Sequence, residues 1–193
     1  AKENVAGRVL IFDLGGGTFD VTVADVTGTD VQIKASTGNS DLGGVDFDKA
    51  LLEYFEKLYN EEHNSALYET PEERDEMLIY CEEVKKSLSK KNDTSFTLRG
   101  PSGRCKGTIS RDTFTELISS HIASMEMLIE TALEESSDTP DTINSVLLVG
   151  GSSRIPAVQK MLESMFKKAP TQVGNLDESV AHGGAIYAGL RMI

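Results

Sequence analysis

Residues 13–23 read DLGGGTFDVTV, and this stretch decides the fold. Asp13 closes a run of apolar residues, three glycines and a threonine follow, and Asp20 opens an alternating stretch. Glycine has no side chain, so its backbone can turn at positive φ and approach a ligand closely. Successive N–H groups in such a turn form a cradle for anions, and carboxylates are suitable partners for Mg²⁺. The stretch therefore indicates a hairpin that binds a magnesium-bound polyphosphate, with an ordinary tight hairpin as the alternative.

Two known phosphate-binding motifs do not fit this hairpin. A Walker A loop needs Gly-Lys-Ser/Thr after the glycines, and a dinucleotide fingerprint needs GxGxxG. A second glycine turn strengthens the phosphate interpretation, because the apolar strand predicted at residues 145–149 runs into Gly150-Gly151 and then into a helix. Such a turn lets a nucleotide lie over a helix start.

The pattern of apolar residues predicts an α/β protein. Strands are expected at residues 8–14, 19–26 and 31–36 as an antiparallel meander, and near residue 172. A capping box of Thr70 and Glu73, with Pro71 at the first helical position, predicts the start of a helix that ends near residue 90. Further expected elements are helices at 47–60, from 110 through about 133, at 157–167 and from about 178, and strands at 95–99 and 105–109.

The middle of the chain reads helix-helix-strand-strand, unlike its two ends. We expect residues 1–45 and 111–193 to form one α/β subdomain, and residues 46–110 to form an α+β subdomain inserted in it.

Composition limits the classes of partner. The 193 residues are 39% hydrophobic and carry a formal net charge of -12, which disfavours nucleic acid and anionic membrane surfaces. No apolar run approaches the roughly 20 residues that span a membrane, and no signal-peptide pattern stands at the start. The two cysteines have no metal-binding spacing, so we expect a reducing compartment and a cytoplasmic location.

Three stretches in this order resemble the DnaK-like seventy-kilodalton heat-shock chaperones. The family's DLGGGTFDV matches Asp13–Val21, LGGxDFD matches Leu42–Asp48, and VGGSSRIPxVQ matches Val149–Gln159. The DES-A-GGA ending also fits, at Asp177–Ala185. The resemblance covers essentially the whole chain and implies the second lobe of an actin-like, ribonuclease H-like ATPase domain. It also implies that a first lobe precedes this chain and that a peptide-binding domain follows it.

The resemblance implies roles for particular residues. Asp13 and Thr18 support catalysis, whose main residues lie in the first lobe; Asp13 assists Mg²⁺ through water, and Asp20 faces a K⁺ ion. The residues implied to contact ATP or ADP are Gly15, Gly16, Gly17 and Thr18 at the phosphates, Gly44 near the phosphates or ribose, Glu82, Lys85, Lys86 and Ser89 at the ribose and adenine, and Gly151, Ser152, Arg154 and Asp177 around the adenosine.

The chain departs from the family pattern at several positions. Lys86 stands where an arginine usually lies flat against adenine, and a lysine has no planar face for stacking. Val45 replaces a usual glutamate and Leu176 a usual proline, while Asp41 and His182 are also unusual. These changes affect the expected affinity and nucleotide preference more than the expected fold.

The resemblance implies an ATP-driven chaperone with several partners: the first lobe, a peptide-binding domain, a nucleotide-exchange factor, a J-domain co-chaperone and unfolded polypeptides. A sugar kinase of the same superfamily is an alternative, which phosphate transfer to a sugar would support. A non-hydrolysing chaperone relative or a filament-forming actin-like protein is another. Intact Asp13, Gly15–Thr18 and Gly150–Arg154 argue against a degenerate relative.

Overall fold

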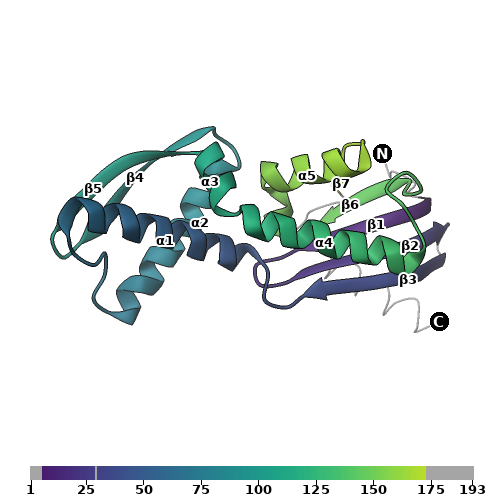
Figure 1. The fold of residues 1–193 in the computed structure, drawn as a ribbon, viewed down its shortest axis with the longest axis horizontal. Helices are drawn as coiled ribbons and strands as arrows, with labels where there is room; N and C mark the ends of the chain where they lie inside the picture. Colours follow the sequence, from purple (N-terminus) through teal and green to yellow (C-terminus); the bar gives the residue numbers. More distant parts are fainter. Residues whose placement is uncertain (1–5, 29, 173–193) are drawn as a thin grey trace. The chain divides into compact units, whose positions relative to one another are not determined.

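The computed structural model describes residues 6–28 and 30–172 (Figure 1). The chain divides into two compact units. One comprises Ala1–Gly44 and Ile122–Ile193, here called the sheet unit, and the other is Val45–His121, the insert unit. Within the described ranges, no helix is long and apolar enough to cross a membrane.

The sheet unit is built on five strands in the order β3-β2-β1-β6-β7. The predicted meander is confirmed: β1 (Gly7–Leu14), β2 (Phe19–Thr27) and β3 (Asp30–Asn39) pair antiparallel. Strand β6 (Ser145–Val149) pairs parallel with β1, and β7 (Thr171–Gln172) pairs parallel with β6. Central β1 therefore ends at Leu14 with an antiparallel neighbour on one side and a parallel neighbour on the other.

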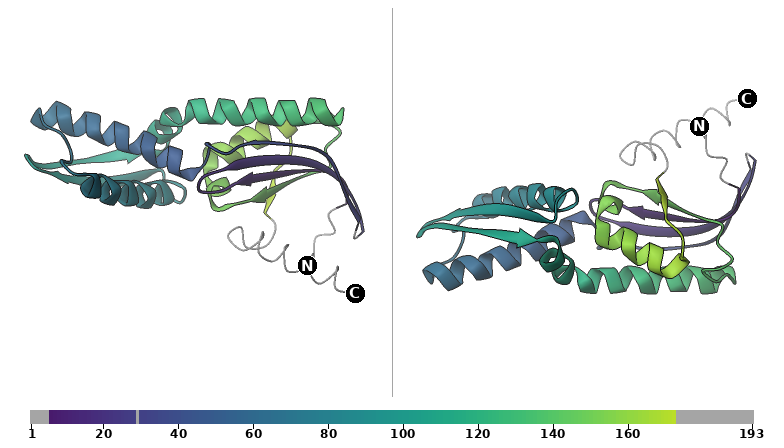
Figure 2. Two further views of the ribbon diagram at one scale, coloured as in Figure 1. Left: turned by 90° about the horizontal axis from the view of Figure 1, so that it is seen from below. Right: turned by 90° about the horizontal axis from the view of Figure 1, so that it is seen from above.

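Helices α4 (Ser119–Ser136) and α5 (Pro156–Phe166) lie on one face of this sheet (Figure 2). Both helices turn an apolar stripe inward at helical spacing, which buries hydrocarbon and is the main source of their stability. The buried residues are Met125, Ile129, Ala132 and Leu133 on α4, and Val158, Met161, Leu162 and Phe166 on α5. On the sheet, the fully buried Phe12 and Phe19 rings contact each other with centroids 4.8 Å apart and planes tilted by 51°.

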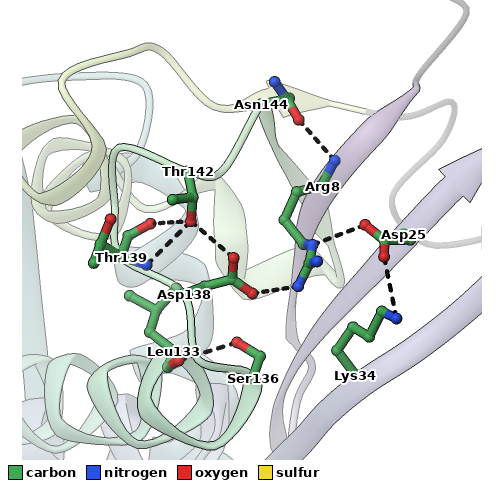
Figure 3. Close-up of polar contacts among 9 residues, drawn as sticks. All are labelled: Arg8, Asp25, Lys34, Leu133, Ser136, Asp138, Thr139, Thr142 and Asn144. Carbon is green, nitrogen blue, oxygen red and sulfur yellow. Dashed lines mark hydrogen bonds and ion pairs between the residues drawn. The ribbon is translucent and has the colours of Figure 1, made fainter.

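Arg8 joins the start of β1 to three other segments of the sheet unit (Figure 3). Its Nε donates to Asp25 Oδ1 at 2.8 Å, and a second guanidinium nitrogen pairs with Asp138 in the loop after α4. The backbone N–H of Arg8 donates to Asn144 Oδ1 at 2.7 Å. Burial opposes ionisation of Asp25, but hydrogen bonds from Lys34 and Arg8 outweigh it, so the pKa of this carboxyl is lowered. This network lies at the opposite end of β1 from Leu14 and serves the fold.

The insert unit contains most of α1 (Gly44–His63) together with α2 (Pro71–Leu88), the hairpin of β4 (Asp93–Gly100) and β5 (Gly103–Ser110), and α3 (Arg111–Leu117). Its core follows the i, i+4 spacing of α1, since Phe47, Leu51, Phe55 and Tyr59 are all fully buried. The predicted capping box of α2 is confirmed: the Glu73 N–H donates to Thr70 Oγ1, and the Glu73 carboxylate accepts from the Thr70 N–H.

Two predicted elements differ from the structure. The helix expected from residue 110 is two helices, α3 and α4, because α3 ends at Ile118 with φ -97° and ψ 8°. The apolar spacing continues across the break, so periodicity does not reveal it, whereas Ser119 and Ser120 are weak helix formers. Strand β3 extends to Asn39, beyond the predicted end at residue 36, and Lys34 forms a bulge between the Ala24–Ile33 and Val23–Ala35 pairs.

Candidate functional site

The glycine stretch forms the turn between the antiparallel strands β1 and β2. Asp13 on β1 pairs directly with Asp20 on β2, so the two carboxylates stand on neighbouring strands at the mouth of the turn. The Gly15 N–H donates to the Thr18 carbonyl at 3.0 Å, which closes the turn. Gly16, Gly17 and Thr18 are exposed, and a Cβ added at either glycine would meet nothing within 4 Å. The turn is therefore open for an approaching ligand.

The prediction that these glycines turn the backbone at positive φ is wrong. Gly15, Gly16 and Gly17 are not among the residues with positive φ, so the turn does not require them for that conformation. Gly16 and Gly17 are exposed and carry no side chain that would cover their backbone. Close approach of a ligand to this backbone stays a prediction.

A second segment packs onto the same turn from within the sheet unit. The Gly44 N–H donates to the Gly15 carbonyl at 3.0 Å. A Cβ at Gly43 would lie 2.6 Å from both the Gly16 carbonyl oxygen and the Gly17 nitrogen, so this position requires glycine. The match to LGGxDFD pointed to Gly44 alone, and the structure adds Gly43 as the residue that lets the two backbones meet.

The second glycine turn reaches the end of β1. Gly150 has φ +79°, and a Cβ there would lie 2.3 Å from the Leu14 carbonyl oxygen and 2.8 Å from Asp13 Oδ1. The turn continues as a short 3₁₀ helix, η1 (Gly151–Arg154), in which the buried Ser153 hydroxyl donates to the Val149 carbonyl. The structure thus brings the predicted residues of both glycine turns to one edge of the sheet.

Charge at this edge favours a cation. Burial, and then the negative charge of Asp20, raise the pKa of the Asp13 carboxyl. Asp20 is exposed, and its carboxylate has room because the residue paired with it on β3 is Gly38. A Cβ at Gly38 would lie 2.5 Å from Asp20 Oδ1. Two like charges on adjacent strands beside uncovered N–H groups suit a cation that accompanies an anion.

Asp20→Asn is expected to lower the pKa of Asp13, because it removes the second cause of the shift and leaves burial in place. Asp13 binds its proton more tightly in the folded state, so it contributes stability at low pH that is lost as the pH rises through the folded pKa. In the variant this loss should be smaller and should be complete at a lower pH. Carboxyl ¹³C NMR against pH measures both proteins, with Asp30→Asn at the far end of the strands as the control. An unchanged Asp13 pKa in Asp20→Asn would contradict this electrostatic description.

The other predicted contacts lie on α2 of the insert unit. Glu82, Lys86 and Ser89 are spaced i, i+4 and i+7, which places them along one face of the helix. Lys86 Nζ is 3.0 Å from Glu82 Oε1, as the spacing predicts, and the Lys86 side chain is 66% exposed. The hydrogen bond from Lys86 outweighs partial burial and lowers the pKa of Glu82. The Ser89 hydroxyl donates back to the Lys85 carbonyl at the end of the helix.

Lys85 is placed differently from its neighbour. Its side chain is only 8% exposed, and its Nζ lies 2.8 Å from Asp48 Oδ2 on α1. Sequence reasoning missed Asp48, although it is the last residue of the matched LGGxDFD stretch. The sequence does not show that Asp48 and Lys85 pair, because they lie 37 positions apart.

Cys81 lies one helical turn before Lys85 on α2. Burial, with the negative charges of Asp48 and Glu56, raises the pKa of its thiol to about 12. Burial and Glu62 raise the pKa of Cys105 to about 11. Both thiols are therefore protonated near neutral pH, so neither cysteine is expected to react as a thiolate.

The structure thus gathers Asp13, Gly15–Thr18, Asp20, Gly44 and Gly151 in the sheet unit, and Glu82, Lys85, Lys86 and Ser89 on one helix of the insert unit. Ser152 and Arg154 belong to the 3₁₀ helix beside Gly150. Asp177, Leu176 and the helix predicted from about residue 178 lie outside the described residues.

The chain is similar to known proteins over nearly its whole length. The family model described as Hsp70 protein matches residues 1–192. A chaperone protein dnaK1 from Prochlorococcus marinus is 36% identical over 194 residues, which cover 97% of this chain and 29% of that protein. The chaperone protein DnaK of Deinococcus proteolyticus is 34% identical over 190 residues, and the chaperone protein dnaK of Cyanophora paradoxa is 38% identical over 188. Each of these two alignments covers 94% of this chain and 30% of the relative. The chain spans about three tenths of the length of these relatives.

Proposed function

This chain belongs to the Hsp70 family, and from that premise we propose that it is an ATP-binding part of a molecular chaperone. In the proposed cycle, ATP hydrolysis controls the binding and release of unfolded polypeptide. The observation that carries the proposal is the open glycine turn between Asp13 and Asp20, onto which Gly44 is hydrogen-bonded. Exposed backbone N–H groups beside two carboxylates suit the phosphates of a nucleotide and the cations that accompany them.

Each residue of the turn has a proposed task. Gly16, Gly17 and Thr18 bind phosphate oxygens through backbone N–H groups and the Thr18 hydroxyl. Gly15, whose N–H already donates to the Thr18 carbonyl, contacts the phosphates by letting them approach closely. Asp13 holds a water ligand of Mg²⁺, and Asp20 lies toward a K⁺ ion. A bound Mg²⁺ would neutralise phosphate charge. A nearby cation would favour the ionised Asp13 carboxyl, whose pKa is raised by burial and then by the charge of Asp20.

We propose one set of adenosine contacts in the sheet unit and a separate set in the insert unit. In the sheet unit, Gly151, Ser152 and Arg154 contact the nucleoside, together with Asp177. In the insert unit, Glu82, Lys85, Lys86 and Ser89 of α2 do so. The 3.0 Å pair between Lys86 and Glu82 supports this role, because it holds the exposed lysine along the helix face. A lysine gives less stacking on adenine than an arginine.

The chain covers about three tenths of its relatives, so the activity of a whole protein is also part of the proposal. We propose that hydrolysis needs a further ATPase lobe and that this chain alone is a poor ATPase. The proposed partners are that lobe, a peptide-binding domain, a nucleotide-exchange factor, a J-domain co-chaperone and unfolded polypeptides, in the cytoplasm. No described feature favours the sugar-kinase alternative.

Calorimetric titration with Mg·ADP tests the proposal, with Mg·GDP as the comparison. The adenosine contacts are expected to make the dissociation constant for ADP at least about tenfold smaller, which corresponds to about 1.4 kcal/mol. Equal heats for the two nucleotides would contradict the adenosine assignment. No heat from either at millimolar concentration would contradict nucleotide binding by this chain.

A further inference from the structure

The insert unit contains a buried ion pair that joins helices α1 and α2. Asp48 and Lys85 are both charged and both buried, at 6% and 7% exposure. They come from different helices, and Lys85 Nζ donates to Asp48 Oδ2 at 2.8 Å. Burying two charges carries a large desolvation penalty that their attraction offsets only in good geometry.

Stabilisation of the fold alone is a weak explanation for this buried ion pair. A buried ion pair can often be replaced by apolar residues of similar size without loss of stability, whereas removal of one partner is strongly destabilising. The Asp48 carboxylate is also incompletely satisfied, because its Oδ1 has no hydrogen-bond partner among the described residues. Burial outweighs the Lys85 hydrogen bond and raises the pKa of Asp48. The pair is therefore retained at a cost, which points to a function.

The geometry of α2 indicates what the function is. Lys85 and Lys86 are consecutive, yet the ammonium of Lys86 is exposed and bound to Glu82 on its own helix, while that of Lys85 is held from α1. A lysine side chain has four rotatable carbon–carbon bonds, and holding it in one geometry costs conformational entropy. The ion pair with Asp48 already orders the Lys85 side chain in the free protein, so this entropy is not lost again when a ligand binds.

We propose that Asp48 is a positioning residue that holds the Lys85 ammonium ready for the ribose of a bound nucleotide. Asp48 lies in the second turn of α1, which begins at Gly44, the residue hydrogen-bonded to the glycine turn. Asp48 acts through Lys85 and does not itself touch the nucleotide. The inference rests on the proposed nucleotide binding by this chain.

Mg·ADP titration of four proteins tests the proposal: the unchanged chain, Lys85→Met, Asp48→Asn, and the double variant Asp48→Leu with Lys85→Met. Lys85→Met and Asp48→Asn are each expected to weaken ADP binding about tenfold, the size of a lost hydrogen bond to a charged group. The double variant has no buried charge and is expected to fold like the unchanged chain. It should bind ADP as weakly as Lys85→Met, because the two residues act as one unit.

A second readout follows the lysine itself. The ¹³Cε resonance of Lys85 is expected to report a single fixed environment in the unchanged chain and to move toward the values of exposed lysines in Asp48→Asn. Asp46→Asn is the matched control, since Asp46 lies in the same helix and its carboxylate pairs with Lys49 at 2.9 Å. It should leave both the resonance and the ADP affinity unchanged.

The outcomes separate the two proposals. If the double variant binds ADP as tightly as the unchanged chain, the pair is structural and the inference is wrong. If Asp48→Asn folds and binds like the unchanged chain while Lys85→Met is weakened, Asp48 does not position Lys85. If the unchanged chain itself does not bind Mg·ADP, the proposed function fails, and the inference fails with it.

Discussion

Gly150→Ala is expected to destabilise the sheet unit by about 3 kcal/mol, the sum of a strained backbone and a forced contact. Gly150 has φ +79°, which an alanine adopts only with strain. The added Cβ would also lie 2.3 Å from the carbonyl oxygen of Leu14 in the central strand, and backbone atoms of a paired strand cannot move aside easily. Thermal unfolding should show a midpoint about 6–12 °C lower.

Gly28→Ala is the matched control for this prediction. Gly28 also has a positive φ, of +63°, but a Cβ there would meet nothing within 4 Å. Its replacement therefore carries only the conformational cost, about 1 kcal/mol. Equal loss of stability in the two variants would show that Gly150 does not pack against β1 as the structure describes.

Gly16→Ala is expected to weaken Mg·ADP binding by about 10- to 100-fold while leaving stability nearly unchanged. Gly16 is exposed, it is not among the residues with positive φ, and a Cβ there meets no other atom within 4 Å. The fold therefore does not require glycine at position 16. Phosphate binding does, because the methyl group of alanine would hinder close approach of a phosphate to the backbone N–H groups. The loss of one charged hydrogen bond, about 1.5–3 kcal/mol, corresponds to this range.

Adenosine serves as the ligand control for Gly16→Ala, because it has no phosphate. Calorimetry or equilibrium dialysis should give the same adenosine affinity for the variant and the unchanged chain. If adenosine and Mg·ADP are weakened equally, the glycine turn is not the phosphate site. If the variant loses stability comparable to Gly150→Ala, the turn is less open than the structure describes.

Local patterns predicted most of the elements. The alternation after Phe19 and the apolar run before Asp13 both became paired strands, and the capping box at Thr70 begins α2 as expected. These features depend on neighbouring residues, which a single sequence contains. The end of β3 and the break at Ile118 depend on pairing partners and on tertiary packing, and the apolar spacing does not report either of them.

The same division applies to the candidate site. The order acid, three glycines, threonine and acid was enough to predict the turn, because its chemistry lies within eight residues. Burial of Lys85 was not predictable from its helical spacing, because its partner Asp48 is 37 residues away. The contact of Gly150 with Leu14 likewise follows from parallel pairing of β1 with β6, which the sequence does not state.

We propose that the backbone of the glycine turn binds the phosphates of a nucleotide. Amide ¹H–¹⁵N NMR tests it most directly, since it also detects binding in the millimolar range. Addition of Mg·ADP is expected to shift the signals of Gly15, Gly16, Gly17 and Thr18, whereas Mg²⁺ with adenosine leaves those four in place. If these amides stay unchanged at several millimolar Mg·ADP, or respond equally to adenosine, the turn does not bind phosphate and the account is wrong.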